Sequence, residues 1–325
     1  MMDEPWFWRE DSAAAGAIRA VLSPLSRAYA AGARLRADFT KPQRAPAPVL
    51  CVGGASLGGA GKTPFCLMLA DLLSEKLSQI AFLTRGYGGA SAGPLRADAE
   101  KHTFRDVGDE ALLLAKKKPT WVARNRVAGA RAASAAGADL IIMDDGFQNP
   151  TLVKDFSILL ADRETIAGAG AVFPAGRLRE PFSEARNRAD YIVCVESSSL
   201  SAADGDADDQ AWLELDLSDA PKRAIAFCGI ARPERFFTGL RDGGVELIAT
   251  SAYRDHAVFS QAQVQALLKA AADQDAGLIT TEKDLVRIDP GLRSKIFAIR
   301  AQMRLHQPEK LLSAIEARLS QHDAG

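Results

Sequence analysis

The sequence lacks several features that would assign it to a specialised class. Its four cysteines are scattered without a C-x-x-C pair, which excludes a predicted disulfide or zinc framework and suits a reducing compartment. No run approaches the ~18 apolar residues of a membrane-spanning helix. Lys and Arg number 40 and Asp and Glu 41, so there is no basic field for nucleic acid. The N-terminal residues lack the basic region of a signal peptide, and a cytosolic or peripheral protein is expected.

A glycine-rich loop is the first strong signal. The apolar run 49–52 predicts a strand, residues 65–73 predict a helix, and the loop between them ends in Gly-Lys-Thr. This order cradles a polyphosphate, with Lys62 on the β- and γ-phosphates and Thr63 on Mg²⁺. An ordinary glycine turn is the alternative, but it would not require Lys-Thr. Ser56 stands where the strict pattern has glycine. The predicted nucleotide-binding residues are Ser56, Leu57, Gly58, Gly59, Ala60, Gly61, Lys62, Thr63 and Pro64.

Two acidic pairs follow the loop. An apolar strand delivers Asp144 and Asp145 at its carboxyl end, about 80 residues after Lys62, as a magnesium-binding carboxylate requires. A turn is the alternative, but the upstream loop favours the metal site. Asp109 and Glu110 begin a predicted helix, where acids are common for electrostatic reasons alone. A functional carboxylate there, facing the phosphates as a base or through magnesium, is compatible with that simpler interpretation.

Basic side chains and one histidine complete the candidates. Arg177 and Arg179 lie in a loop framed by Gly and Pro, which can present guanidinium groups to phosphate, although surface arginines are common. Arg126 lies on a helix that follows a short predicted strand at 121–123. His256 follows Asp255; such a pair is more often structural than catalytic, but it is chemically able.

Strands and helices alternate along most of the chain. This pattern predicts an α/β fold of the P-loop NTPase kind, a mostly parallel sheet flanked by helices. Residues 197–210 are rich in Ser, Ala and Asp and are interpreted as a surface loop or linker. The alternation resumes after them and predicts a smaller C-terminal α/β domain. The expected division is 1–40 for an N-terminal helix region, 41–218 for the nucleotide domain and 219–325 for the second domain.

Residues 12–36 predict an amphipathic basic helix. Apolar side chains recur at helical spacing from Ile18 to Tyr29, arginines supply the charge, and an aromatic cluster at 6–8 precedes them. Such a helix can lie on an anionic lipid surface or pack on the protein with its arginines solvated, and the pattern favours neither. Pro24 is expected to kink or restart it.

Together these stretches resemble the tetraacyldisaccharide 4'-kinase family, membrane-associated kinases of lipid A biosynthesis. Gly54 and Asn149 depart from the family pattern, which usually has Asn and often has His at these places. The similarity runs in the same order over nearly the whole chain. The motifs that carry it are Pro5-Trp-Phe-Trp8, Leu22-Ser-Pro-Leu25 with Tyr29, Gly58-Gly-Ala-Gly-Lys-Thr-Pro64, Arg85-Gly-Tyr87, Val107-Gly-Asp-Glu110, Asp144-Asp-Gly-Phe-Gln148, Pro174-Ala-Gly-Arg-Leu-Arg-Glu-Pro181, Gly229-Ile-Ala-Arg-Pro233, Asp255-His256 and Thr280-Thr-Glu-Lys-Asp284.

The resemblance implies a reaction and a location. The γ-phosphate of ATP would pass to the 4'-hydroxyl of an acylated glucosamine disaccharide 1-phosphate and give the lipid A precursor lipid IVA. ATP and Mg²⁺ are the implied cofactors. The implied protein is a monomer that binds no nucleic acid and lies on the cytoplasmic face of the bacterial inner membrane.

The resemblance also implies residue roles. Asp109 looks like the general base, assisted by His256 across a cleft between the two domains. Lys62, Thr63, Glu110 and Asp144 look like contacts to phosphate and Mg²⁺, the metal ligands being Thr63, Glu110 and Asp144. Arg126 and Arg177 look like phosphate clamps. The alternatives are a P-loop kinase or ATPase for a soluble small molecule and a non-enzymatic ATP switch, whereas the missing Asn-Lys-x-Asp pattern disfavours a GTPase.

Overall fold

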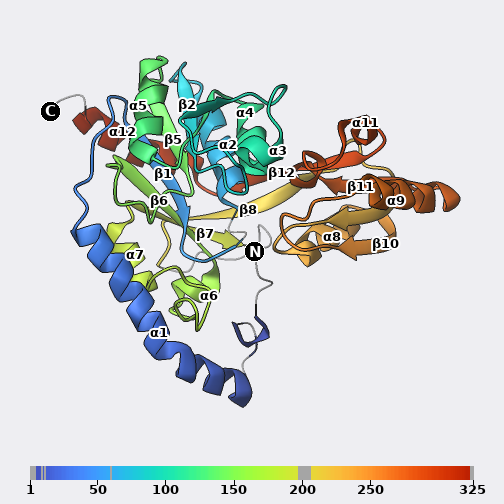
Figure 1. Ribbon diagram of the computed structural model, residues 1–325, viewed down its shortest axis with the longest axis horizontal. Coiled ribbons are helices and arrows are strands. Elements are labelled where there is room, and N and C mark those ends of the chain that lie inside the picture. The colour runs from blue at the N-terminus through green and yellow to red at the C-terminus, as the bar shows by residue number, and fades with distance from the viewer. Residues whose placement is uncertain (1–4, 9, 11, 59–60, 197–205, 323–325) are drawn as a thin grey trace.

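A single mixed sheet organises the computed structural model, which describes residues 5–8, 10, 12–58, 61–196 and 206–322 (Figure 1). Twelve strands of these residues pair in the order β10-β9-β11-β12-β8-β7-β6-β1-β5-β2-β4-β3. Two of the neighbouring pairs are antiparallel, β3 with β4 and β8 with β12, and the others are parallel. The strands are β1 (Val49–Gly54), β2 (Ile80–Thr84), β3 (Leu95–Ala97), β4 (Thr120–Val122), β5 (Leu140–Asp144), β6 (Phe156–Ala161), β7 (Tyr191–Glu196), β8 (Asp209–Asp216), β9 (Arg223–Cys228), β10 (Glu246–Ala252), β11 (Gly277–Thr281) and β12 (Phe297–Leu305).

Helices cover both faces of this sheet, as expected for parallel strands. A 3-10 turn, η1 (Trp6–Trp8), precedes the first of them. The helices are α1 (Ala13–Asp38), α2 (Lys62–Leu73), α3 (Phe104–Val107), α4 (Asp109–Ala115), α5 (Arg126–Ala135), α6 (Arg163–Ile166), α7 (Phe182–Arg188), α8 (Pro233–Asp242), α9 (Gln261–Asp273), α10 (Glu282–Leu285), α11 (Pro290–Arg293) and α12 (Pro308–His322).

The central strands are apolar throughout because both of their faces are covered. In β1, Leu50 and Val52 point into a core shared with α2 and α12, whereas Val49 and Cys51 point into a core shared with α5 and α7. The chain crosses from β5 over β1 to β6, so the strand order reverses beside β1. Ligands of open parallel sheets bind at the carboxyl ends of strands beside such a reversal. The glycine loop leaves β1 at this place.

A smaller part of the sheet lies to the right in Figure 1. Here β9 and β11 carry α8 on one face and α9 on the other. The antiparallel pair of β8 and β12 joins this part to the larger one, and α12 returns to pack in the core of α2. The mixed α/β architecture expected from the sequence is thus present. The division at residues 40 and 218 stays a prediction.

The structure corrects one expectation within the presumed linker. Residues 209 and 210 begin β8 and are buried, so the strand starts inside the stretch interpreted as a loop. Asp209 caps a neighbouring segment, because its carboxylate accepts hydrogen bonds from the backbone N–H groups of Gln210 and Gln307. The polar composition therefore reflects a satisfied buried acid, which composition alone does not distinguish from a surface loop. Residues 197–205 lie outside the described part.

The N-terminal helix is longer than expected and is not restarted by proline. Pro24 lies inside the unbroken α1. The Ser26 hydroxyl donates to the carbonyl of Val172 at 2.7 Å, and Phe173 stacks edge-on against Trp8 and Tyr29. These contacts hold α1 against the loop before α7. None of the helices in the described part of the chain combines the length and apolar content needed to cross a bilayer.

Phe82 provides a test of the central core. Its ring in β2 is fully buried, so Phe82→Ala should lower the free energy of unfolding by about 3–5 kcal/mol, through lost burial and the cavity left behind. Urea unfolding followed by circular dichroism measures this change. The matched control is Phe39→Ala, since Phe39 is 86% exposed and its loss should cost under about 0.5 kcal/mol. Equal effects of the two substitutions would contradict this placement of the core.

Candidate active site

The glycine loop connects β1 to α2 and is held in shape by a second loop. The Leu57 N–H donates to the carbonyl of Arg177 at 2.8 Å, and the Arg179 N–H donates to the carbonyl of Ala55 at 3.0 Å. Ser56 is buried, and it forms an isolated antiparallel β-bridge with Leu178 between these two hydrogen bonds. Gly61 caps α2 with φ = 74°, a left-handed conformation that favours glycine. The first turn of α2 therefore directs its free N–H groups toward the loop. Gly59 and Ala60 lie outside the described residues.

Four side chains meet where β1, α2 and β5 converge. The Thr63 hydroxyl donates to Asp144 Oδ2 at 2.9 Å, and Lys62 Nζ lies 3.8 Å from Asp145 Oδ1. Asp145 also accepts a hydrogen bond from Arg179 at 2.9 Å. The structure thus brings together the phosphate-loop residues and the acids that the sequence predicts beside them, although their roles stay predictions.

The two neighbouring acids have opposite electrostatic surroundings. Burial is the main cause that raises the pKa of Asp144 to about 7, with Glu110 and Asp145 adding negative charge beside it. Burial opposes the charge of Asp145 too, but Lys62 and Arg179 outweigh it and lower its pKa. Asp144 Oδ1 is buried and has no hydrogen-bond partner among the described residues. An acidic oxygen left in this state fits the place of a cation.

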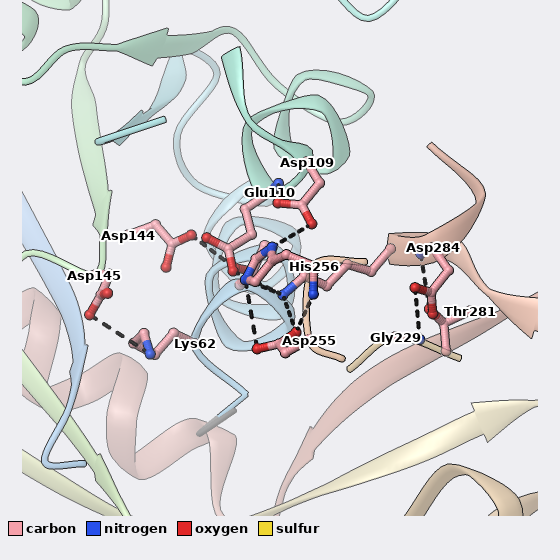
Figure 2. A network of polar contacts seen from close by, with 12 residues as sticks. Lys62, Asp109, Glu110, Asp144, Asp145, Gly229, Asp255, His256, Thr281 and Asp284 are labelled. Carbon is pink, nitrogen blue, oxygen red and sulfur yellow. Dashed lines mark hydrogen bonds and ion pairs between the residues drawn. The ribbon is translucent and has the colours of Figure 1, made fainter. Parts of the chain in front are cut away.

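A second cluster lies where side chains from the larger and the smaller part of the sheet meet (Figure 2). His256 Nδ1 lies 2.9 Å from Asp109 Oδ2, across 147 residues of sequence. Lys283 Nζ lies 3.3 Å from Glu110 Oε1, and Arg287 Nε lies 3.3 Å from Asp109 Oδ2. Asp109 and Glu110 begin α4 after Gly108. His256 lies in the loop after β10, Lys283 lies in α10, and Arg287 lies two residues after that helix. Both sides of the structure therefore contribute to one charged network.

Charge in this network decides the ionisation of its members. Burial works to raise the pKa of Asp109, but the hydrogen bond from His256 and the positive charges of Lys283 and Arg287 produce a net lowering. Burial works against the ammonium of Lys283, yet Glu110, Asp109 and Asp255 raise its pKa above its ordinary value. Asp109 is therefore a carboxylate and Lys283 a cation at neutral pH.

One pocket is common to both clusters. Lys62, Thr63 and Asp145 line it on one side, and Glu110 and His256 line it on the other. Trp8, Tyr29 and Phe173 line it toward α1. Asp109 is 3% exposed and lies behind this lining. The pocket therefore joins the phosphate loop, the acid–histidine pair and the N-terminal aromatic residues.

The three arginines considered from the sequence have different surroundings. Arg126 lines the pocket, and burial lowers the pKa of its guanidinium to about 10 while its Nε has no partner among the described residues. Arg177 is turned toward Asp162 and Glu164, at 2.7 and 3.3 Å. Arg179, two residues later, reaches Asp145 and lines the pocket. Arg179 is thus the arginine of its loop that lies beside Lys62.

Several neighbours of the site were not assigned roles from the sequence. Lys283 belongs to Thr280-Thr-Glu-Lys-Asp284, one of the motifs that carry the family resemblance, but the sequence assigned it no role. Nothing in the sequence singles out Arg287, although it is 3% exposed and donates to the carbonyls of Ala257 and Gly229. Arg179 was considered beside Arg177, but the spacing gave no means of choosing between them.

Comparisons with known proteins identify the family of the chain. A family model described as tetraacyldisaccharide-1-P 4'-kinase matches residues 18–320. The chain belongs to this family. It is 44% identical to the tetraacyldisaccharide 4'-kinase of Parvibaculum lavamentivorans over 299 residues, 88% of this chain and 87% of the relative. It is 40% identical to that of Rhodospirillum centenum over 335 residues, 99% of this chain and 98% of the relative.

A solved structure of the family has the same fold. An LpxK from Aquifex aeolicus, described as the "apo" form in complex with ATP, superposes with a TM-score of 0.75 and 27% identity, covering 93% of this chain and 99% of that one. The fold, the enzyme class and the family expected from the sequence are confirmed. The protein is a kinase of the tetraacyldisaccharide 4'-kinase type.

The raised pKa of Asp144 predicts how the free energy of unfolding depends on pH. The folded protein keeps the Asp144 proton up to about pH 7, whereas the unfolded chain releases it near an ordinary pKa of about 3.9. The folded state thus binds more protons in this window, and this group makes the free energy of unfolding fall as pH rises from about 4 to about 7. Asp144→Asn should remove that part of the fall and make the protein more stable than wild type at pH 7.5.

Urea unfolding at pH 5 and pH 7.5 measures the difference between the two proteins. The control is Asp71→Asn on the exposed face of α2, which should leave the pH dependence of wild type unchanged. A pH dependence that is the same with and without Asp144 would show that this carboxyl is not the buried group the structure describes.

Proposed function

We propose that the protein transfers the γ-phosphoryl group of ATP to the 4'-hydroxyl of tetraacyldisaccharide 1-phosphate at the pocket described above. The observation that carries this proposal is the contact of Asp109 with His256, which lies in the same pocket region as Lys62. A phosphate loop alone would serve any ATP-binding protein. An acid–histidine pair facing that loop supplies the base that a sugar hydroxyl needs.

The reaction needs a proton acceptor and charge stabilisation. Asp109 takes the hydroxyl proton, the hydroxyl oxygen forms a bond to the γ-phosphorus, and the bond from that phosphorus to the bridging oxygen breaks to leave ADP. His256 donates to Asp109 and holds it in place. Since Asp109 lies behind Glu110 and His256, we infer that these side chains separate to admit the hydroxyl.

The residues around the phosphate loop fit magnesium nucleotide. Lys62 would contact the β- and γ-phosphates, and Thr63, Asp144 and Glu110 would hold Mg²⁺, whose chemistry is to neutralise charge on the phosphates. The unpaired Asp144 oxygen and the nearby Glu110 charge support this assignment. No group of three or more His, Cys, Asp and Glu within the described residues forms a complete metal site. Mg²⁺ usually keeps waters and phosphate oxygens as further ligands.

Arginines would stabilise the transferring phosphoryl group. Arg126 and Arg179 line the pocket, and both guanidinium groups have a buried Nε without a partner among the described residues. Arg177 keeps its predicted role as a clamp only if it exchanges Asp162 and Glu164 for phosphate. The geometry therefore favours Arg179 over Arg177 for this contact.

The exposed face of α1 supports membrane attachment. Its exposed apolar residues fall at spacings that place them on one face of a helix, opposite the residues packed on the protein. These exposed residues are Val21, Leu25, Leu35 and Phe39. The aromatic end of the pocket lies beside the same helix. A lipid acceptor held on the cytoplasmic face of the bacterial inner membrane by this peripheral protein fits both features.

The activity and the base can be tested in one assay. Labelled ATP and tetraacyldisaccharide 1-phosphate in detergent micelles should yield a phosphorylated lipid with wild type. Asp109→Asn should lower kcat by about 10²–10⁴, because the amide cannot accept the hydroxyl proton. ATP hydrolysis without labelled lipid would favour an ATP switch, and transfer only to soluble alcohols would favour a soluble-substrate kinase.

A matched control separates the base from a helix cap. Asp106 caps α3 through the backbone N–H and hydroxyl of Thr103 and is exposed. Asp106→Ala should cost roughly 1 kcal/mol of stability and spare turnover. If Asp109→Asn behaved in the same way, with near-normal kcat, Asp109 would not be the base.

Membrane attachment has its own test. Replacing Val21, Leu25 and Phe39 together by serine should lower binding to anionic vesicles by at least about tenfold. Each serine buries less apolar surface in lipid than the side chain it replaces. Co-sedimentation with vesicles measures the binding. Val258→Ser is the control, since Val258 is 53% exposed and lies outside α1. Unchanged binding by the triple variant would exclude this face as the attachment surface.

A further inference from the structure

Lys283 lies between the acid–histidine pair and Glu110. It belongs to the single turn α10, directly after β11. Its Nζ lies 3.3 Å from Glu110 Oε1, 3.4 Å from His256 Nε2 and 3.7 Å from Asp255 Oδ1. The proposed reaction gives Lys283 no contact with either substrate, so these neighbours must explain its position.

The contact with His256 has a chemical consequence for the ring. An ammonium group has three donors and no acceptor, so Lys283 can bind Nε2 only if that nitrogen carries a lone pair. At the other nitrogen, Nδ1 lies 2.9 Å from the Asp109 carboxylate, which can only accept. Both contacts are satisfied by one form of the imidazole, the neutral tautomer with its proton on Nδ1.

Asp255 competes with Lys283 for the same nitrogen. Its Oδ2 lies 3.7 Å from His256 Nε2, beyond hydrogen-bond distance but close enough to favour a proton there. Arg287 reaches Asp109, and the ring of Tyr87 lies tilted beside the imidazole with the two centroids 5.4 Å apart. Without Lys283, Nε2 would lose its donor, and the imidazole would lie between the carboxylates of Asp109 and Asp255.

We propose that Lys283 is a positioning residue that holds His256 in the neutral tautomer with the proton on Nδ1. This inference rests on the proposed function, in which Asp109 accepts the hydroxyl proton. In the opposite tautomer, the lone pair of Nδ1 would face the lone pairs of Asp109 and the contact would be lost. Lys283 therefore keeps His256 as a fixed donor to Asp109, in the way that the hydrogen-bond partner of one imidazole nitrogen sets the state of the other.

The contact with Glu110 offers a different explanation, which the experiment must separate. Glu110 is a proposed magnesium ligand, and Lys283 could act only by orienting it. In that case, removing Lys283 would raise the Mg²⁺ concentration needed for activity and leave the imidazole unchanged. The tautomer of His256 is thus the quantity that distinguishes the two explanations.

Nuclear magnetic resonance of the full chain with ¹⁵N-labelled histidine reads this quantity directly. The chain has four histidines, so the ring signals can be assigned by His256→Gln. Wild type at pH 7.5 should show His256 with a protonated Nδ1 and an unprotonated Nε2. Lys283→Met should shift the Nε2 signal of His256 away from this pattern, because that nitrogen loses its donor and faces Asp255, and adding Asp255→Asn to this variant should reverse the shift. Lys283→Arg, which keeps a donor, should resemble wild type.

Kinetics in the lipid assay at saturating Mg²⁺ complete the test. Lys283→Met should lower kcat at least about tenfold with little change in the KM for ATP, and Lys283→Arg should recover part of the loss. Lys269→Met is the control, since Lys269 is exposed and pairs with Asp273 on α9. A His256 spectrum that Lys283→Met leaves unchanged overturns the proposal, as does a wild-type ring protonated on Nε2. Failure of wild type to phosphorylate the lipid would instead refute the proposed function, because the spectrum does not depend on turnover.

Discussion

The hydrogen bond between Asp109 and His256 is the interaction on which the site depends, because it joins elements that are distant in the chain. Asp109 starts α4 in the larger part of the sheet, and His256 lies in the loop after β10 in the smaller part. The antiparallel pair of β8 and β12 places these parts beside each other. Asp109 is 3% exposed, and the groups that offset the cost of burying its charge, His256, Lys283 and Arg287, all come from the smaller part. The contact therefore holds the two sides of the pocket in one arrangement.

Two of the acids in the site lie beside cations of the protein. Lys62 and Arg179 compensate Asp145, whereas Lys283 and Arg287 compensate Asp109. Asp144 differs from both, because Thr63 gives it one neutral hydrogen bond and its nearest charges include other acids. The protein thus balances the acids that face its own cations and leaves one beside the phosphate loop uncompensated. The surroundings of Asp144 therefore suit a cation, as in the magnesium site proposed above.

The sequence predicted the half of the site that is built from local patterns. Lys62 and Thr63 begin the helix after the glycine loop of β1, and Asp144 ends β5, which lies parallel beside β1. Parallel strands bring their carboxyl ends to one edge of the sheet. The other half depends on long-range packing. His256 and Lys283 have no sequence spacing that relates them to Asp109, and only family resemblance indicated a role for His256. Arg177 and Arg179 show a different limit. An extended backbone would place side chains two residues apart on the same side, yet Arg177 turns to Asp162 and Arg179 turns to Asp145, and the sequence does not show which of them reaches the pocket. For β8, the polar stretch that leads into it concealed the start of the strand.

The form of the pocket relates the proposed lipid acceptor to helix α1. Phe173 lies against Trp8 and Tyr29 of the N-terminal segment, and the same residues line the pocket that reaches Lys62. Apolar chains of a lipid acceptor would therefore meet aromatic side chains near α1, while its sugar hydroxyl meets charged side chains farther in. Because the exposed apolar face of α1 points away from the protein, a lipid surface on that face would lie beside the aromatic end of the pocket. A soluble acceptor would use the charged end alone and would leave both the aromatic lining and the exposed face of α1 without a purpose.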